Sequence, residues 1–222
     1  MPADLHTHSE ASSDSTLEID ERLKLATEKK LTTIAITDHM AVHDQLTARE
    51  QLWDGKRIVT GIELNCNIWG QRIDVLGHFI DPKKMRERVG STTMTGTTVE
   101  DGNDLNPETV INWIHNAGGT ATLAHPGRYD FDLHRVVELL VEAGLDGLEI
   151  EYPYETYDVT RTGSPYTPVG EMRELATTHE LIQTGGSDCH GYDYRDGVTF
   201  MGEVHLPDKR VKALRQRSEL YR

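Results

Sequence analysis

The chain has 222 residues, 36% of them hydrophobic and 27% charged, and a formal net charge of −14. This length suffices for one sizeable core, so a single domain over residues 1–222 is expected. An acidic surface disfavours binding to duplex DNA, whose phosphates attract Lys and Arg, and no apolar run approaches the ~20 residues that cross a membrane. Two cysteines, Cys66 and Cys189, cannot build a disulfide framework, which favours a reducing, cytoplasmic location.

Apolar, β-branched runs alternate with helical patterns from the first residues to the last. Strands are expected at 3–6, 31–37, 57–64, 120–124, 145–150, 181–184 and 198–205. Helices are expected at 16–30, 44–53, 107–118, 133–143, 169–179 and from about 207. Residues 67–80 are typical of a hairpin that turns at Trp69-Gly70-Gln71, and the polar residues 81–106 are expected to form a long loop or lid.

This repeated alternation of strand and helix predicts an α/β fold, in the form of a parallel (β/α) barrel with its helices outside. The chain is shorter than the ~250 residues usual for eight such units. An incomplete or seven-stranded barrel therefore fits better. An open doubly wound sheet is the alternative, but it explains less well why so many strand ends carry metal-ligand side chains.

These ligand side chains lie at or just after the predicted strand ends. His6 and His8 alternate, so that both imidazoles point to one side of the first strand, and Asp14 lies in the next loop. Later strand ends carry His39, Glu63, His78, His125, Asp188 and His190. Because strand ends of a (β/α) barrel meet at one face, these nine residues should converge. They exceed the three or four ligands of one catalytic zinc and predict two or three divalent ions, Mn, Fe or Zn.

Clustered divalent ions suit hydrolysis of phosphate esters, because they hold phosphoryl oxygens and turn a bridging water into the attacking hydroxide. Glu63 is expected to bridge two ions, and Arg128, directly after His-Pro-Gly, to clamp the substrate phosphate. Glu63, Asp188 and Arg128 are thus the expected catalytic residues. A metal-dependent amidohydrolase acting on a C–N bond is an alternative, although no Lys stands at a strand end to bridge the metals. A non-catalytic metal module is a third possibility.

The pattern leaves four further residues open. Asp38 precedes His39 and either supports the site or is plain structure. Glu149 and Glu151 flank Ile150, so alternation sends both to one side, toward the barrel mouth. His205 ends an apolar run as the ligands do, but it stands in no matching motif.

Six motifs occur in order along most of the chain. They are DLHTHS followed by Asp14, then ITDH, GIEL, LGHFID, AHPGRY and GGSDCHG. This ordered set resembles the PHP (polymerase and histidinol phosphatase) family of metal-dependent phosphoesterases. The resemblance implies a distorted seven-stranded, TIM-like βα barrel with a trinuclear metal site.

The resemblance also implies how the ligands are shared among the three metals. It puts His6, His8, Glu63 and Asp188 on the first, Glu63, His78 and His125 on the second, and Asp14, His39 and His190 on the third. The HPGRY form is similar to PHP phosphoesterases that act on small nucleotides or RNA ends. The expected substrate is a small phosphomonoester, a nucleotide or a short oligonucleotide, with histidinol phosphate as an alternative.

Overall fold

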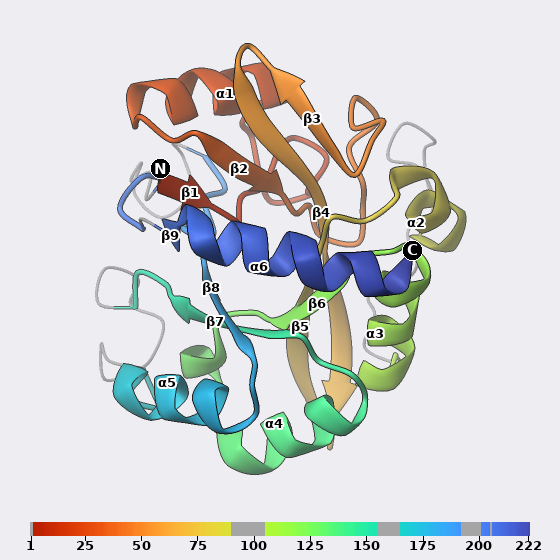
Figure 1. Cartoon of the computed structure of the whole chain (residues 1–222), viewed down its shortest axis with the longest axis vertical. Coiled ribbons are helices and arrows are strands. Elements are labelled where there is room, and N and C mark those ends of the chain that lie inside the picture. The colour runs from red at the N-terminus through yellow and green to blue at the C-terminus, as the bar shows by residue number, and fades with distance from the viewer. Residues whose placement is uncertain (1, 90–104, 155–164, 192–200, 205) are drawn as a thin grey trace.

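The structure, a computed structural model, describes residues 2–89, 105–154, 165–191, 201–204 and 206–222 (Figure 1). Within these ranges the strands are β1 (Pro2–Asp4), β2 (Thr33–Ile36), β3 (Glu50–Trp53), β4 (Lys56–Ile68), β5 (Gln71–His78), β6 (Thr120–Leu123), β7 (Gly147–Glu151), β8 (Ile182–Gly185) and β9 (Leu206–Pro207). The α-helices there are α1 (Ile19–Glu28), α2 (Pro82–Val89), α3 (Pro107–Asn116), α4 (Leu133–Glu142), α5 (Val169–Thr178) and α6 (Asp208–Ser218). Among these described helices, none combines the length and the apolar character that a membrane crossing requires.

The strands form one curled sheet in the order β8-β7-β6-β5-β4-β2-β1-β9, with β3 paired to β4 beside this path. Backbone hydrogen bonds beyond the ends of β1 and β8 bring the two together. Leu5 N donates to Gly185 O over 3.2 Å, Asp188 N to His6 O over 2.8 Å and His8 N to Cys189 O over 3.0 Å. Seven strands, β1, β2 and β4 to β8, therefore make a nearly closed barrel, which confirms the predicted α/β fold.

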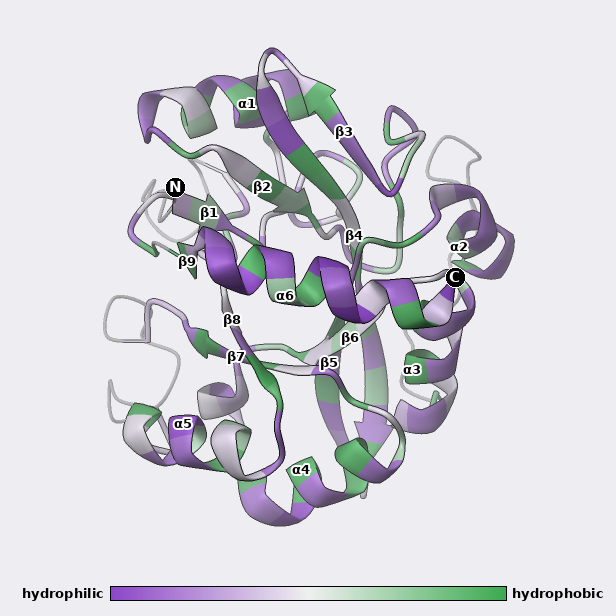
Figure 2. Ribbon diagram, in the orientation of Figure 1, coloured by the Kyte–Doolittle hydropathy of each residue, from purple (hydrophilic) through white to green (hydrophobic). Residues whose placement is uncertain are grey.

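Helices cover the outside of the barrel because each carries one apolar stripe. In α4, Leu133, Val136, Val137 and Leu140 are buried at helical spacing, while Asp132 caps the helix by accepting a hydrogen bond from Arg135 N. Figure 2 shows the same division of each helix into hydrophobic and hydrophilic faces. The sheet interior and the helix stripes together form the main core.

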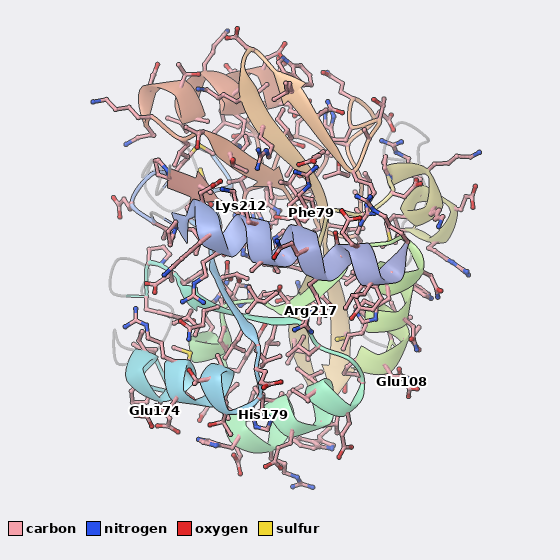
Figure 3. The ribbon with its side chains drawn as sticks, in the orientation of Figure 1. Phe79, Glu108, Glu174, His179, Lys212 and Arg217 are labelled. Atoms are coloured by element: carbon pink, nitrogen blue, oxygen red, sulfur yellow. The ribbon has the colours of Figure 1, made fainter. Side chains whose placement is uncertain are left out.

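Helix α6 closes the end of the barrel from which the parallel strands start. Its Val211 and Leu214 belong to one buried cluster with Ala3, Val59 and Phe79, and Phe79 lies beside α6 in Figure 3. Apolar side chains fill the middle of this end. The ligand residues lie toward the opposite end, where the parallel strands finish.

The hairpin expected at 67–80 is confirmed by β4 and β5. Three other expected elements differ from the structure. The helix expected at 44–53 is wrong, because β3 runs through its last residues and returns into β4 at Asp54-Gly55, both with positive φ. The loop expected over 81–106 is wrong for Pro82–Val89, which form α2. Residues 201–204 form turns rather than the expected strand, and 198–200 and His205 lie outside the described residues.

Candidate metal centre

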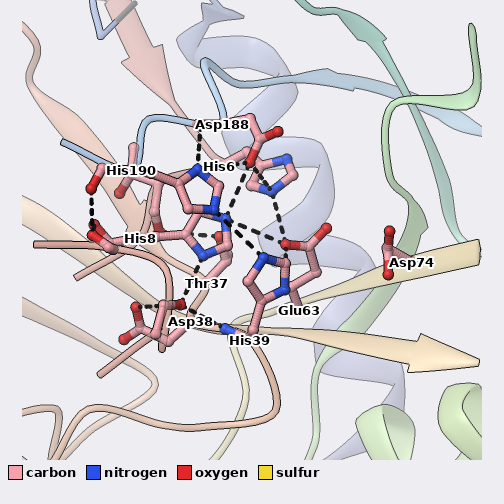
Figure 4. Close-up of polar contacts among 12 residues, drawn as sticks. His6, His8, Thr37, Asp38, His39, Glu63, Asp74, Asp188 and His190 are labelled. Carbon is pink, nitrogen blue, oxygen red and sulfur yellow. Dashed lines mark hydrogen bonds and ion pairs between the residues drawn. The ribbon is translucent and has the colours of Figure 1, made fainter. Parts of the chain in front are cut away.

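Eight of the nine ligands predicted from the sequence gather on the side of the barrel where the parallel strands finish, and Figure 4 shows His6, His8, His39, Glu63, Asp188 and His190 among them. They are His6, His8, Asp14, His39, Glu63, His125, Asp188 and His190. Two of them, His125 and Asp188, have positive φ values of 28° and 53°. Such backbones are unfavourable for residues other than glycine and cluster at functional sites. The sharp turns send these side chains from their strand ends into the centre.

Glu63 is the hub of the cluster. This side chain is fully buried in the middle of β4. Its Oε2 lies 3.2 Å from His6 Nε2, 3.3 Å from His8 Nε2 and 3.1 Å from His39 Nδ1, and its Oε1 lies 3.3 Å from His125 Nε2. One carboxylate thus reaches four imidazoles that come from three separate segments of the chain.

The cluster divides into three groups, each with its ligand atoms within 4.8 Å of one another. These groups are His6, His8, Glu63 and Asp188; Glu63, Asp74 and His125; and His8, His39 and His190. Asp14 joins the last of them, because its Oδ2 lies 3.3 Å from His190 Nε2 and 3.6 Å from His39 Nε2.

The donor set fits divalent ions. Two ligand atoms that each lie ~2.1 Å from one tetrahedral ion are ~3.4 Å apart. The separations around Glu63, from 3.1 to 3.3 Å, are close to this value. In addition, His8 Nε2 and His39 Nδ1 are buried with no hydrogen-bond partner among the described residues. A buried polar nitrogen needs a partner, and a metal ion can be that partner because neutral imidazole is a common metal ligand.

Opposite charges in the cluster keep its carboxyl groups ionised. Burial alone would raise the pKa of Glu63, but His39 and His6 outweigh burial and hold that pKa well below its usual value. The pKa of Asp188 is likewise well below the ordinary range, because the charge of His6 and the imidazole of His8, whose Nε2 lies 3.2 Å from Asp188 Oδ1, more than offset burial. Both side chains are therefore present as carboxylates, the form that ligates metals.

Glu149 supports the centre from β7. Its Oε1 lies 3.1 Å from His6 Nδ1, and its Oε2 accepts a hydrogen bond from His125 N over 2.8 Å. A carboxylate on Nδ1 fixes an imidazole so that Nε2 is free to ligate. Glu151 does not share this role, because the β7–β8 register shifts between the two glutamates and Glu151 binds the exposed Arg173 over 2.7 Å.

Asp38 supports the same centre from the side of His8. It accepts hydrogen bonds from Ser9 N over 2.6 Å and from Ser9 Oγ over 2.7 Å. Ser12 Oγ lies 3.0 Å from His8 Nδ1 and donates to Asp38 Oδ1 over 3.3 Å. Asp38 is thus a support of the loop that carries His8 and Asp14.

His78 is the predicted ligand that the structure does not bring to the cluster. Its Nε2 donates to the carbonyl oxygen of Leu5 over 2.8 Å, and burial lowers the pKa of His78 to about 4. Asp74, four residues earlier on β5, takes its place beside Glu63 and His125. The cause is strand direction: β5 runs antiparallel to β4, with Gly61 opposite His78 and Asn65 opposite Asp74. The beginning of β5, not its end, therefore lies at the face where the parallel strands finish.

A cavity of about 400 Å³ opens onto the cluster. It is lined by Asp14, His39, Arg72, Asp74, His125, Arg128, Tyr129, Asp188 and His190. Arg128 therefore reaches the centre as expected, and its Nη1 donates to Asp188 Oδ2 and to Tyr152 OH, each over 3.3 Å. Tyr152 OH also donates to Asp188 Oδ2 over 2.8 Å. Among these, Arg72, Asp74 and Tyr152 were not singled out by the sequence.

Segments of this sequence are similar to curated proteins, and the whole fold is similar to that of a solved structure. A segment of 75 residues is 43% identical to a phosphoribosyl 1,2-cyclic phosphate 1,2-diphosphodiesterase of Eggerthella lenta and covers 33% of this chain and 24% of that protein. A segment of 86 residues is 31% identical to a 3′,5′-nucleoside bisphosphate phosphatase of Chromobacterium violaceum, covering 37% of this chain and 27% of that protein. The aligned segments thus span about a quarter of these curated relatives.

The fold is similar to that of a candidate metal-dependent phosphoesterase of Bifidobacterium adolescentis, with a TM-score of 0.71, 19% identity and 98% of both chains covered. The profile of the PHP domain matches residues 4–152. This match covers most of the chain, including the segments that carry His6, His8, Glu63 and His125. The chain therefore belongs to the PHP domain family.

Proposed function

We propose that the protein is a metal-dependent phosphoesterase that hydrolyses a phosphomonoester or the phosphate of a nucleotide or short oligonucleotide. The observation that carries this proposal is the position of Glu63, which joins two ligand groups beside a cavity that arginines also line. Related proteins named as a diphosphodiesterase and as a bisphosphate phosphatase support the same reaction class.

In this proposal the protein holds two or three divalent ions, Mn, Fe or Zn. His6, His8, Glu63 and Asp188 hold the first, and Glu63, Asp74 and His125 hold the second. Asp14, His39 and His190 hold the third. Such ions supply Lewis-acid polarisation of phosphoryl oxygens and lower the pKa of water near them.

The protein's own side chains bind and orient the substrate. Arg128 lies at the cavity wall beside Asp188, and a guanidinium there would hold phosphoryl oxygens by charge-assisted hydrogen bonds. Glu149 and Tyr152 hold His6 and Asp188 in place, so that the site is pre-formed before the substrate arrives. The amidohydrolase alternative is less well supported, because no lysine occurs among the described residues that line the cavity.

The proposal is tested by incubating the protein with phosphorylated metabolites, nucleotides, nucleoside bisphosphates and short oligonucleotides, with added Mn²⁺ and with chelator. Phosphate release from at least one substrate is expected with Mn²⁺, and chelator should abolish it until Mn²⁺ is restored. A chain that holds metal but releases phosphate from no compound in the panel would contradict the proposed activity.

The second metal assignment gives a prediction for two neighbouring side chains on β5. Asp74→Asn should lose about one of the two to three bound ions. Among the described residues, Asp74 is the only side chain of β5 in the ligand groups, and an amide is a weaker ligand than a carboxylate. His78→Asn should keep all of them and lose only about 1 kcal/mol of stability with its hydrogen bond to Leu5. Elemental analysis of both variants after reconstitution with Mn²⁺ measures this. Loss of an ion from His78→Asn alone would return the second site to His78.

A further inference from the structure

Arg72 lines the wall of the cavity, but the proposed reaction gives this side chain no role. It lies on β5 two residues before Asp74, so both side chains point to the same face of the strand. Half of its side chain is exposed. It lines the cavity together with Asp74 and His125.

Two donors of the Arg72 guanidinium are bound to neighbouring side chains. Nε donates to Asp74 Oδ1 over 3.0 Å, and Nη2 donates to Asn65 Oδ1 over 2.8 Å. Asn65 lies directly opposite Asp74 in the β4–β5 pairing. Because the guanidinium is planar and rigid, these two bonds fix its orientation against the hairpin.

This arrangement divides the two oxygen atoms of Asp74. Oδ1 is bound to Arg72, whereas Oδ2 lies 3.9 Å from His125 Nε2 and is directed toward the centre. Asp74 itself is only 8% exposed, so its carboxylate has little freedom to turn away. Figure 4 shows Asp74 on the far side of Glu63 from the histidine cluster.

The group that contains Asp74 also has the greatest need of a nearby cation. It combines the carboxylates of Glu63 and Asp74 with the single imidazole of His125, and all three are buried. Two buried carboxylates near each other repel, and an arginine beside one of them offsets this repulsion.

We propose that Arg72 is a positioning residue for the second metal site: it holds Asp74 Oδ1 so that Oδ2 alone is offered to the ion. This inference rests on the proposed function, because it requires that Asp74 is a ligand. It assigns Arg72 a role distinct from that of Arg128, which lies against Asp188 and faces the substrate. Groups that orient a metal ligand change metal affinity when they are removed, typically by 10- to 100-fold.

The test uses Arg72→Gln and Arg72→Lys in the full chain. Metal-free protein is titrated with Mn²⁺ by calorimetry, and steady-state kinetics are measured over a range of Mn²⁺ concentrations. Arg57→Gln is the matched control. Arg57 is also a partly exposed strand arginine with a carboxylate partner, Glu50, and it lies at the end of β4 away from the site.

Arg72→Gln is expected to weaken one Mn²⁺ site about 10- to 100-fold and leave the others unchanged. Arg72→Lys should fall between this variant and the wild type, because one ammonium group cannot reproduce the fork between Asp74 and Asn65. At saturating Mn²⁺, kcat should recover and KM for the substrate should be unchanged. All variants should melt at the wild-type temperature when metal-free, which a purely structural role would not predict.

Three other results would overturn the inference. Unchanged Mn²⁺ affinity with a raised KM would show that Arg72 binds substrate. Unchanged affinity with an unchanged KM would show that it does neither. An equal loss of Mn²⁺ affinity in Arg57→Gln would show that the effect comes from the loss of any positive charge and not from the position of Arg72. Failure of the wild-type chain to bind any Mn²⁺ would instead refute the proposed function itself.

Discussion

Replacing Glu63 with glutamine should lower phosphoesterase activity at least ~10³-fold, which corresponds to about 4 kcal/mol of lost transition-state stabilisation. The reason is that Glu63 lies in two of the three ligand groups and also contacts His39 of the third. An amide keeps the shape of the side chain but loses the charge and one acceptor. Activity of Glu63→Gln should be measured at saturating Mn²⁺, together with its metal content.

Glu151→Gln is the matched control for this variant. Glu151 lies on β7 beside the centre, but it binds Arg173 at the surface instead. Exposed ion pairs contribute at most about 1 kcal/mol, so its activity and metal content should remain at the wild-type level. Wild-type activity in Glu63→Gln would contradict the assignment of Glu63 as the shared ligand.

Gly186→Ala should unfold or severely destabilise the barrel, by about 3 kcal/mol or more. A Cβ at Gly186 would lie 2.2 Å from His6 Cβ and 2.4 Å from His6 N. This contact lies at the seam where the continuation of β8 passes that of β1, so a main-chain segment would have to move. The movement would displace His6, and both the midpoint of urea unfolding and the metal content should fall.

Gly170→Ala tests the same chemical change where space is open. A Cβ at Gly170 meets nothing within 4 Å, and the residue lies in α5. Alanine is the better helix former, so this variant should be as stable as the wild type or more stable by up to about 1 kcal/mol. If Gly186→Ala unfolded at the same urea concentration as Gly170→Ala, the close approach of the two strands would be refuted.

The sequence predicted most of the candidate centre because its logic needs only strand ends. His6, His8, His39 and Glu63 follow or lie in apolar runs that the structure confirms as β1, β2 and β4. Alternation along a strand and the common direction of parallel strands are enough to bring such residues together. No distances between residues distant in sequence were needed for that step.

The position of His78 shows where this logic ends. It assumes that a ligand stands at the carboxyl end of its strand, which holds only for strands of the same direction. The hairpin at Trp69-Gly70 makes β5 run antiparallel to β4. The residue of β5 that lies beside Glu63 at the metal centre is therefore Asp74 and not His78. The hairpin itself was predicted, so the direction of β5, and with it Asp74, could have been inferred from the sequence.

Other features had no local signal. The bond between Arg72 and Asn65 depends on the register of β4 and β5, and the bond between Tyr152 and Asp188 joins residues that follow different strands. The register shift that separates Glu149 from Glu151 is also a property of the pairing of β7 with β8. By contrast, Asp54-Gly55 was a visible hairpin signal for β3 that the helical pattern of 44–53 obscured.

The central claim is that scattered side chains hold divalent ions in one cavity. It is tested most directly by anomalous diffraction from crystals of Mn²⁺-loaded protein, recorded on both sides of the Mn absorption edge. The account predicts two or three peaks, with one between Asp188 and His6, one between Asp74 and His125, and any third beside His190. A cavity without peaks, or a peak on His78 with none near Asp74, would contradict it.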